Sequence, residues 1–207
     1  EMSASLVGSE MCIRDSFDND TKKQLYMDIY DDSMWLINLV ENLLAVTRIE
    51  EGRLNLHITE DLMEDVITEA LHHINRKSEE HHISVESKEE FLLAKMDARL
   101  IVQVIINIVD NAIKYTEDDG QVTFTVRTND RHLYITVADN GPGIADEDKK
   151  KIFDRFYRVD KARTRQKGGF GWGLSLAQQI VLALKGTIIV KDNQPKGTIF
   201  EVKITGV

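Results

Sequence analysis

The stretch from Val137 to Ile144 constrains the fold of this chain most strongly. It ends a run, Leu133–Val137, in which apolar and polar residues alternate as in a half-buried β-strand. Gly141 and Gly143 flank a proline, so the chain can turn sharply and a flat ligand can approach its backbone. Asp139 stands at the end of the strand, where a buried carboxylate is costly without hydrogen-bond donors. The amine of a nucleobase would be such a donor, and a hairpin turn with an Asx cap is the alternative interpretation.

A helical pattern from Gln103 to Thr116 is the second constraint. Apolar residues recur three and four positions apart, which predicts a helix with one buried face. Asn107, Asn111 and Lys114 are spaced so that they share another face. Amide oxygens can ligate Mg²⁺, which also relies on substrate phosphates. A magnesium and polyphosphate site is therefore one interpretation, and a solvated helix surface is the other.

A glycine-rich segment precedes a further helical pattern. Gly169, Gly171 and Gly173 alternate with other residues, and apolar residues follow at helical spacing. The junction of such a loop with a helix presents backbone N–H groups and a positive dipole end to phosphate. No Gly-Lys-Ser or Gly-Lys-Thr follows, so this is not a Walker loop. A flexible linker is the alternative.

Together these segments resemble the ATP-binding domain of sensor histidine kinases, part of the wider family that includes gyrase, Hsp90 and MutL. The resemblance covers roughly residues 57–207 and rests on four motifs in one order. Residues 107–116 are similar to the N box, 139–144 to the first glycine box, 153–158 to the F box and 169–174 to the second glycine box.

The resemblance implies a role for each matching residue. Asn111 would ligate Mg²⁺, with Asn107 beside it. Lys114 would reach the phosphates of ATP, and Tyr115 would line the adenine pocket. Asp139 would accept a hydrogen bond from the adenine amine.

The glycines of both glycine boxes would complete the nucleotide site. Gly141 and Gly143 would give the base room, whereas Gly169, Gly171 and Gly173 would form the hinge and phosphate loop of a mobile lid. The other nucleotide-binding positions implied by the motifs are Ile144, Phe156, Arg158 and Leu174.

The fold class follows from the order of predicted elements. We expect strands covered on one side by helices, an α/β two-layer sandwich, and the resemblance implies the Bergerat-type ATP-binding form. The predicted strands are 54–58, 82–86, 91–95, 121–127, 133–137, 187–190 and 198–204. The predicted helices are 61–81, one that Asp97 caps and that contains 103–116, and one that follows the glycine-rich loop.

The composition excludes several classes of protein. The net charge of −9 argues against broad binding to nucleic acid or to an anionic membrane. A single cysteine, Cys12, leaves no disulfide framework and fits a reducing compartment. No apolar run reaches the roughly 18 residues that span a bilayer. We therefore expect a cytoplasmic region, and the resemblance implies a membrane-anchored parent.

The N-terminal quarter has a different character. Residues 1–16 show no periodicity and are expected to be a disordered or non-native leader, similar to a translated sequencing adapter. Residues 20–51 form one long helical pattern with two apolar lanes, which indicates packing in a bundle. This segment is similar to the second dimerisation helix of histidine kinases, whose bundle is made by two chains. The predicted domains are 1–16 (leader), 17–53 (partial dimerisation helix) and 54–207 (catalytic domain); a monomeric helix is the alternative.

The resemblance implies transfer of the γ-phosphoryl group of ATP to a histidine, for relay to a response regulator. None of the six histidines is followed by a proline in the manner of a phosphoacceptor. We therefore expect a fragment that uses Mg²⁺ and ATP to phosphorylate a histidine-bearing dimerisation helix in trans, and a homodimeric parent. Residues 97–103 resemble the Kdp-type potassium sensor kinases in particular.

One departure supports an alternative function. Phe170 and Trp172 occupy positions of the second glycine box where the family usually has a small or medium residue and then leucine. The alternative is a non-catalytic nucleotide-sensing or dimerisation module. A serine kinase of the anti-sigma type shares the nucleotide motifs but would not need the long helix.

Overall fold

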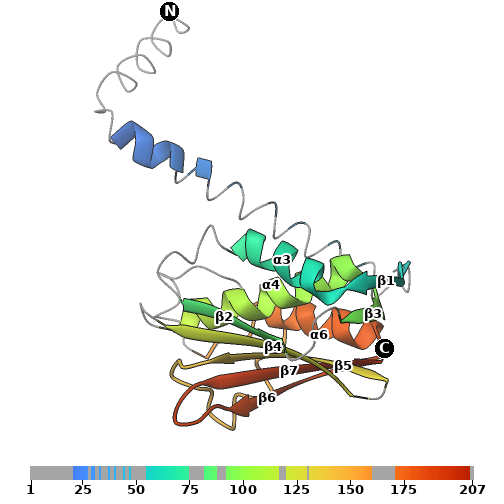
Figure 1. Cartoon of the computed structure of the whole chain (residues 1–207). Helices are drawn as coiled ribbons and strands as arrows, with labels where there is room; N and C mark the ends of the chain where they lie inside the picture. The colour runs from blue at the N-terminus through green and yellow to red at the C-terminus, as the bar shows by residue number, and fades with distance from the viewer. Residues whose placement is uncertain are drawn as a thin grey trace, which may run out of the picture. The chain divides into compact units, whose positions relative to one another are not determined.

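The computed structural model describes most of the chain beyond residue 54 and part of the segment before it (Figure 1). The described residues are 21–27, 29, 30, 33, 37, 40, 44, 47, 55–74, 82–87, 92–116, 120–129, 131–159 and 171–205. The predicted leader, Gly52, Gly169 and Phe170 lie outside them.

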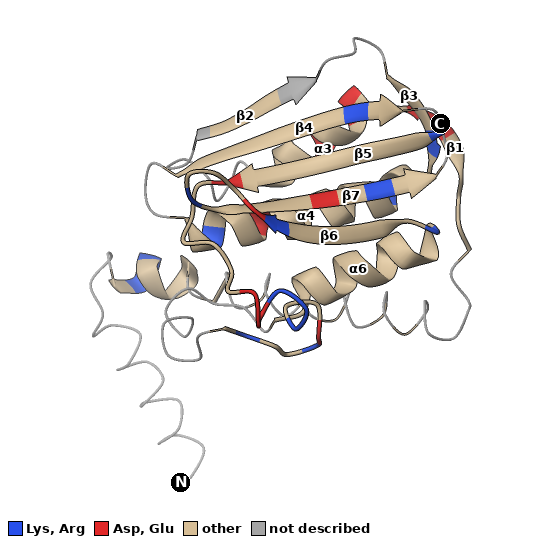
Figure 2. Cartoon of the chain, turned by 90° about the horizontal axis from the view of Figure 1, so that it is seen from below, with Lys and Arg blue, Asp and Glu red and all other residues tan. Residues whose placement is uncertain are grey.

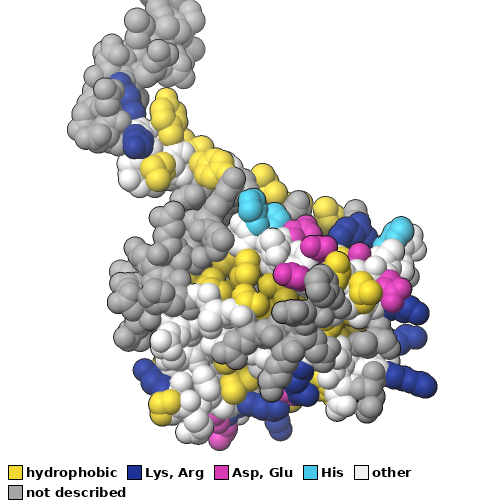
Figure 3. Space-filling view, viewed as in Figure 1, with side chains coloured by type: hydrophobic (Ala, Val, Ile, Leu, Met, Phe, Trp, Pro, Cys, Tyr) yellow, Lys and Arg dark blue, Asp and Glu magenta, His cyan; other side chains and the backbone are white. Residues whose placement is uncertain are grey.

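The chain forms two compact units, residues 1–44 and 45–207. Every described residue of the first unit is helical, as predicted for this part of residues 20–51. Its described apolar side chains, among them Leu25, Ile29 and Val40, are about half exposed (Figure 3). Packing of this helix in a bundle stays a prediction, as does the domain division at residue 54. Within the described residues, no helix combines the length and hydropathy that a membrane span requires.

The second unit is built on a five-stranded sheet of order β2-β4-β5-β7-β6. Its strands are β2 His82–Ser87, β4 Gln121–Asn129, β5 His132–Asp139, β6 Thr187–Asp192 and β7 Thr198–Thr205. β2 runs parallel to β4, and the other neighbours are antiparallel. The predicted strands 121–127 and 133–137 form one antiparallel hairpin, β4 with β5, and 187–190 and 198–204 form another, β6 with β7.

Three helices cover one face of this sheet, as Figure 1 shows. They are α3 Met63–Ile74, α4 Ala98–Tyr115 and α6 Gly173–Ala183, and α4 contacts both others. Inward-facing residues of the strands are fully buried beneath the helices, among them Phe124 of β4, Ile135 of β5 and Phe200 of β7. The predicted two-layer α/β sandwich is therefore confirmed.

The opposite face of the sheet is open (Figure 2) and carries a polar network. Glu201 on β7 accepts hydrogen bonds from Arg127 on β4, at 3.4 Å, and from Lys191 on β6, at 3.1 Å. The Arg127 guanidinium also lies 4.0 Å from the centre of the Tyr134 ring. The contact from Arg127 to Glu201 reaches across β5, whereas Lys191 and Glu201 lie on neighbouring strands, and together these long side chains leave this face polar.

The connection into the second unit differs from the prediction. Residues 55–58, expected in a strand, have no regular structure, and the strand is instead β1 Thr59–Leu62. β1 pairs antiparallel with β3 Leu93–Met96, so the predicted helix from Asp61 begins only at Met63. The sequence of β1 is Thr-Glu-Asp-Leu, which has little strand propensity of its own. Its hydrogen bonds to β3, thirty residues later, decide its structure.

Candidate functional site

Asp139 occupies the carboxyl end of β5 and is only 6% exposed. Its Oδ1 accepts hydrogen bonds from the backbone N–H of Gly141, at 2.9 Å, and of Thr198, at 3.1 Å. Burial raises the pKa of the Asp139 carboxyl, and the hydrogen bonds from Gly141 and Thr198 counteract that rise. The bond from Gly141 makes an Asx turn, so this interpretation of the sequence also holds.

The turn between β6 and β7 fixes the backbone of Asp139. The side-chain amide of Asn193 donates to the Asp139 carbonyl at 2.8 Å. Gly197 has a φ of 124°, and a Cβ at this position would collide with the same carbonyl. Gly143, with a φ of 80°, lies against the Gly197 carbonyl. Only glycine fits these positions without strain, so the two turns hold the carboxylate in place.

Gly141 brings Asp139 to the C-terminal end of α4. A Cβ on Gly141 would stand 2.9 Å from Asp139 Oδ1 and 3.1 Å from the Tyr115 carbonyl oxygen. Tyr115 is 43% exposed at the rim of this contact. Burial raises the pKa of its hydroxyl, and the positive charge of Arg158 opposes that rise. The end of α4 and the turn after β5 therefore meet at one place, where the charge of Arg158 acts on Tyr115.

The middle of α4 meets the start of α6. The Asn107 side chain donates from Nδ2 to the Gln103 carbonyl at 2.8 Å. Its Oδ1 faces Gly173, where a Cβ would stand only 3.1 Å away. Asn111 follows one turn later on the same face of α4 and is partly buried. The amide pair predicted from the sequence is thus beside the N-terminus of α6.

Residues 156–158 and 171–173 also lie side by side. The Phe156 N–H donates to the Gly171 carbonyl at 3.2 Å, and the Phe156 ring meets Trp172 edge to face with centroids 5.0 Å apart. Gly171 has a φ of 71°, and a Cβ there would stand 2.5 Å from the Tyr157 carbonyl oxygen. The segments predicted as the F box and the second glycine box are therefore in contact through a backbone hydrogen bond and an aromatic pair.

Three buried N–H donors at this junction have no acceptor among the described residues. They are Nε and Nη2 of Arg158 and Nε1 of Trp172. Buried donors are nearly always hydrogen-bonded, so each such group calls for an explanation. An anionic ligand with several acceptor oxygens would satisfy a guanidinium in this position.

The structure brings most of the predicted site residues together. Contacts join two groups along α4: one at its C-terminal end, formed by Tyr115, Asp139, Gly141 and Gly143, and one beside its middle, formed by Asn107, Phe156, Gly171 and Gly173. The charge of Arg158 acts on Tyr115. Asn111 and Lys114 lie on α4 between these contacts, and Ile144 packs partly buried on the hydrophobic core. Leu174 is buried in that core. Gly169 lies outside the described residues.

Sequence reasoning missed the residues that support Asp139 from the β6–β7 turn. Thr198, Asn193 and Gly197 are about sixty residues from Asp139 in sequence. The strands on either side of their turn were predicted, but no local pattern showed that the turn would pack on the end of β5. Trp172 was noted only as a departure from the family pattern.

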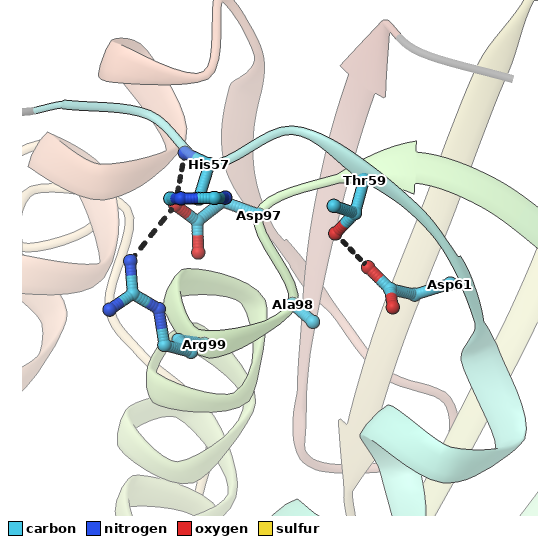
Figure 4. Close-up of a pocket in the computed structure, with 6 residues that line it drawn as sticks. All are labelled: His57, Thr59, Asp61, Asp97, Ala98 and Arg99. Atoms are coloured by element: carbon cyan, nitrogen blue, oxygen red, sulfur yellow. Dashed lines mark hydrogen bonds and ion pairs between the residues drawn. The ribbon is translucent and has the colours of Figure 1, made fainter.

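A cavity of about 360 Å³ lies elsewhere, at the N-terminal end of α4 (Figure 4). It is lined by His57, Thr59, Asp61, Asp97, Ala98 and Arg99. Asp97 accepts hydrogen bonds from the N–H groups of His57, at 2.9 Å, and Leu100, at 3.4 Å. α4 separates this cavity from Tyr115 by its whole length. The described residues include no group of three His, Cys, Asp or Glu that could hold a metal ion.

Comparison with known proteins places these features in context. Residues 96–206 match the family of histidine kinase-, DNA gyrase B-, and HSP90-like ATPases. Sensor protein CiaH of Streptococcus pneumoniae is 69% identical over 108 residues, which are 52% of this chain and 24% of CiaH. Sensor protein KdpD of Clostridium acetobutylicum is 33% identical over 187 residues, which are 90% of this chain and 21% of KdpD. The chain thus matches under a quarter of the length of either relative.

A solved structure is similar over nearly the whole chain. The histidine kinase AdeS of Acinetobacter baumannii superposes with a TM-score of 0.74 at 28% sequence identity. The superposition covers 98% of this chain and 93% of the AdeS chain.

Proposed function

Because the chain belongs to the histidine kinase-, DNA gyrase B-, and HSP90-like ATPase family, we propose that it binds ATP with Mg²⁺ and phosphorylates a histidine. The resemblance to sensor histidine kinases and the Bergerat-type fold inferred from the sequence are confirmed. One observation carries the proposal. The buried Asp139 carboxylate lies beside the C-terminal end of α4, and the Asn107 amide lies on the same helix; at both points a glycine, Gly141 or Gly173, permits close packing.

The end of the site at Asp139 suits the base. Oδ1 of Asp139 already accepts two backbone hydrogen bonds, which fix the carboxylate so that it can accept another from the adenine amine. Because Gly141 has no side chain, the Asp139 carboxylate packs directly against the end of α4 at Tyr115. Tyr115, at the rim, would pack on the adenine ring.

The end at Asn107 suits the phosphates. Eight residues of α4 separate Asn107 from Tyr115, about 12 Å along the axis, which a nucleotide can span. Arg158 offers two buried donors that have no acceptor among the described residues, and the N-terminus of α6 adds its backbone N–H groups. Asn111, between them, would ligate Mg²⁺ with Asn107 beside it, and Lys114 would reach the phosphates.

Phosphoryl transfer depends mainly on positioning and on charge neutralisation. A nitrogen of the acceptor histidine would attack the γ-phosphorus in line, forming a P–N bond while the bond to the ADP oxygen breaks. Mg²⁺ would neutralise phosphate charge. The acceptor would come from a histidine-bearing dimerisation helix, and the phosphoryl group would pass on to a response regulator. The homodimeric, membrane-anchored parent stays a prediction.

Radiolabelled ATP tests the proposal. The chain would be incubated with Mg²⁺, labelled ATP and an added dimerisation domain that carries the acceptor histidine. We expect acid-labile label on that domain and none on a control domain whose acceptor is glutamine. Absence of transfer despite tight ATP binding would refute the kinase, and strong labelling of a histidine of the chain itself would refute the proposal that the acceptor is supplied in trans.

A specific observation favours the alternative of a non-catalytic nucleotide-sensing module. Trp172 is held by Phe156 at the start of α6, where the indole restricts movement of the residues beside the phosphates. In such a module Mg²⁺ and ATP would still change Trp172 fluorescence, but no acceptor would be labelled. A fluorescence titration beside the labelling assay therefore separates the two functions.

A further inference from the structure

Trp172 carries a hydrogen-bond donor that the fold leaves without a partner. Its Nε1–H is buried, and no acceptor lies within reach among the described residues. Indole offers only this one donor, so nothing else on the ring compensates for it. Tryptophan usually finds an acceptor for this group when it is buried. Among the described residues, the buried indole N–H of Trp172 thus lacks an acceptor.

The indole is held in a fixed orientation. Its ring meets Phe156 edge to face, with an interplanar angle of 86°, and it packs against the hydrophobic core. The Trp172 carbonyl accepts the N–H of Leu176 at 2.8 Å, which ties the residue to the first turn of α6. A donor held in this way binds an acceptor without losing much conformational freedom.

The surroundings of Trp172 favour an anion. It is the residue before α6, and its side chain makes no hydrogen bond to the N-terminus of that helix. The first N–H groups and the dipole of α6 therefore stay available to a negatively charged ligand. Arg158, in the segment 156–158 that contacts Gly171, contributes two further buried donors that have no acceptor among the described residues. The next residue, Gly173, lies against Asn107.

We propose that the Trp172 indole N–H donates a hydrogen bond to a phosphate oxygen of the bound nucleotide. This makes Trp172 a binding residue of the site and extends the proposed ATP function, on which it rests. The base is assigned to Asp139, at the C-terminal end of α4, whereas Trp172 adjoins the middle of that helix. The phosphates, not the base, therefore lie within reach of the indole.

Calorimetric titration of the whole chain with Mg²⁺-ATP and with adenosine tests this proposal. Trp172→Phe keeps an aromatic ring against Phe156 but removes the N–H. We expect its Kd for Mg²⁺-ATP to rise about tenfold, as for one hydrogen bond to a charged group, and its Kd for adenosine to stay unchanged. The matched control, Trp35→Phe, should leave both constants as in the wild type.

Other outcomes overturn the proposal in distinguishable ways. An unchanged ATP affinity in Trp172→Phe, or an equal loss for ATP and adenosine, would refute the hydrogen bond while the ATP site stands. A wild-type chain that binds no Mg²⁺-ATP would refute both the hydrogen bond and the proposed function.

A second measurement applies even where Trp172→Phe fails to fold. The wild-type chain labelled with ¹⁵N at its two tryptophans gives two indole N–H signals, which Trp35→Phe assigns. We expect Mg²⁺-ATP at saturation to move the Trp172 signal downfield and to slow its exchange with solvent, whereas adenosine does neither. A Trp172 signal that ignores Mg²⁺-ATP, or that responds equally to adenosine, would refute the proposal.

Discussion

At the scale of single residues, Asp139 shows how a carboxylate can be buried yet remain useful. Two backbone N–H groups satisfy Oδ1, and glycines at 141 and 197 let the surrounding backbone approach. A carboxylate held in this way offers an acceptor in a protected place, where a hydrogen bond to a ligand is worth more than in water.

We predict that Asp139→Asn weakens Mg²⁺-ATP binding about 100-fold without loss of stability. The amide oxygen can still accept from Gly141 and Thr198, but its NH₂ group would face the adenine amine, donor against donor. Calorimetric titration gives the Kd, and urea unfolding gives the stability. The exposed Asp146→Asn makes the same change of charge and should bind ATP like the wild type. Equal affinities of Asp139→Asn and the wild type would remove Asp139 from the base site.

The same carboxyl predicts a pH dependence. Burial raises the pKa of Asp139 above its ordinary value of 3.8 in the folded chain, against the opposing hydrogen bonds. Its contribution to stability is therefore full below that value and is lost as the pH rises through the folded pKa. Asparagine does not titrate. We expect Asp139→Asn to gain stability relative to the wild type between mildly acidic and neutral pH. A constant difference in urea unfolding across this range would contradict the direction of the pKa shift.

At the scale of secondary-structure elements, α4 is the helix of the second unit that contacts both α3 and α6. One side of the helix is buried between α3 and α6, and its exposed side carries the site residues. Asp97 both caps its N-terminus and anchors the connecting segment through the His57 N–H. The Asp97 side chain, in a residue that is 1% exposed, thus connects the start of α4 to the segment that contains His57.

We predict that Asp97→Ala lowers the free energy of unfolding by about 2 kcal/mol. About 1 kcal/mol comes from the lost N-cap, and the rest from a His57 N–H left without its acceptor. Asp97→Asn retains one acceptor and should lose roughly half as much. Urea unfolding measures both, and Glu69→Ala, on the exposed side of α3, should stay within about 0.5 kcal/mol of the wild type. A loss in Asp97→Ala no larger than in Glu69→Ala would show that the cap contributes nothing.

At the scale of the whole molecule, the described site residues all belong to one compact unit. They extend from Asn107 to Thr198, on the face of the sheet that the helices cover. The open face, with its network around Glu201, is separated from them by the sheet itself. Nucleotide binding is thus expected to depend on this unit alone.

We predict that residues 54–207 fold cooperatively by themselves and bind Mg²⁺-ATP with a Kd within about twofold of the whole chain. All the buried hydrophobic residues that the structure describes lie within this range, so it contains their hydrophobic core. Circular dichroism during heating and calorimetric titration test the two parts. A tenfold weaker Kd in residues 54–207 would show that the preceding segment completes the site.

The sequence by itself determined the elements whose patterns are local. Alternation predicted β4 and β5, the strands β6 and β7 were predicted as well, helical spacing predicted α4 and α6, and Asp97 predicted the start of α4. These elements bury a face that their own residues define, so the hydrophobic effect acts on a pattern visible in the sequence. The motif residues of the site were visible for the same reason, since each motif lies within one turn or one helix.

Only the tertiary structure decided how distant segments meet. β1 exists because it pairs with β3, and its own residues favour no strand. The position of Asp139 depends on its hydrogen bonds with Thr198 and Asn193. The donors of Arg158 and Trp172, which have no acceptor among the described residues, belong to the two segments 156–158 and 171–173 that pack together. Whether a polar group finds a hydrogen-bond partner in such contacts depends on residues far away in the chain. The energies of these contacts depend on positions in space that no local sequence pattern records.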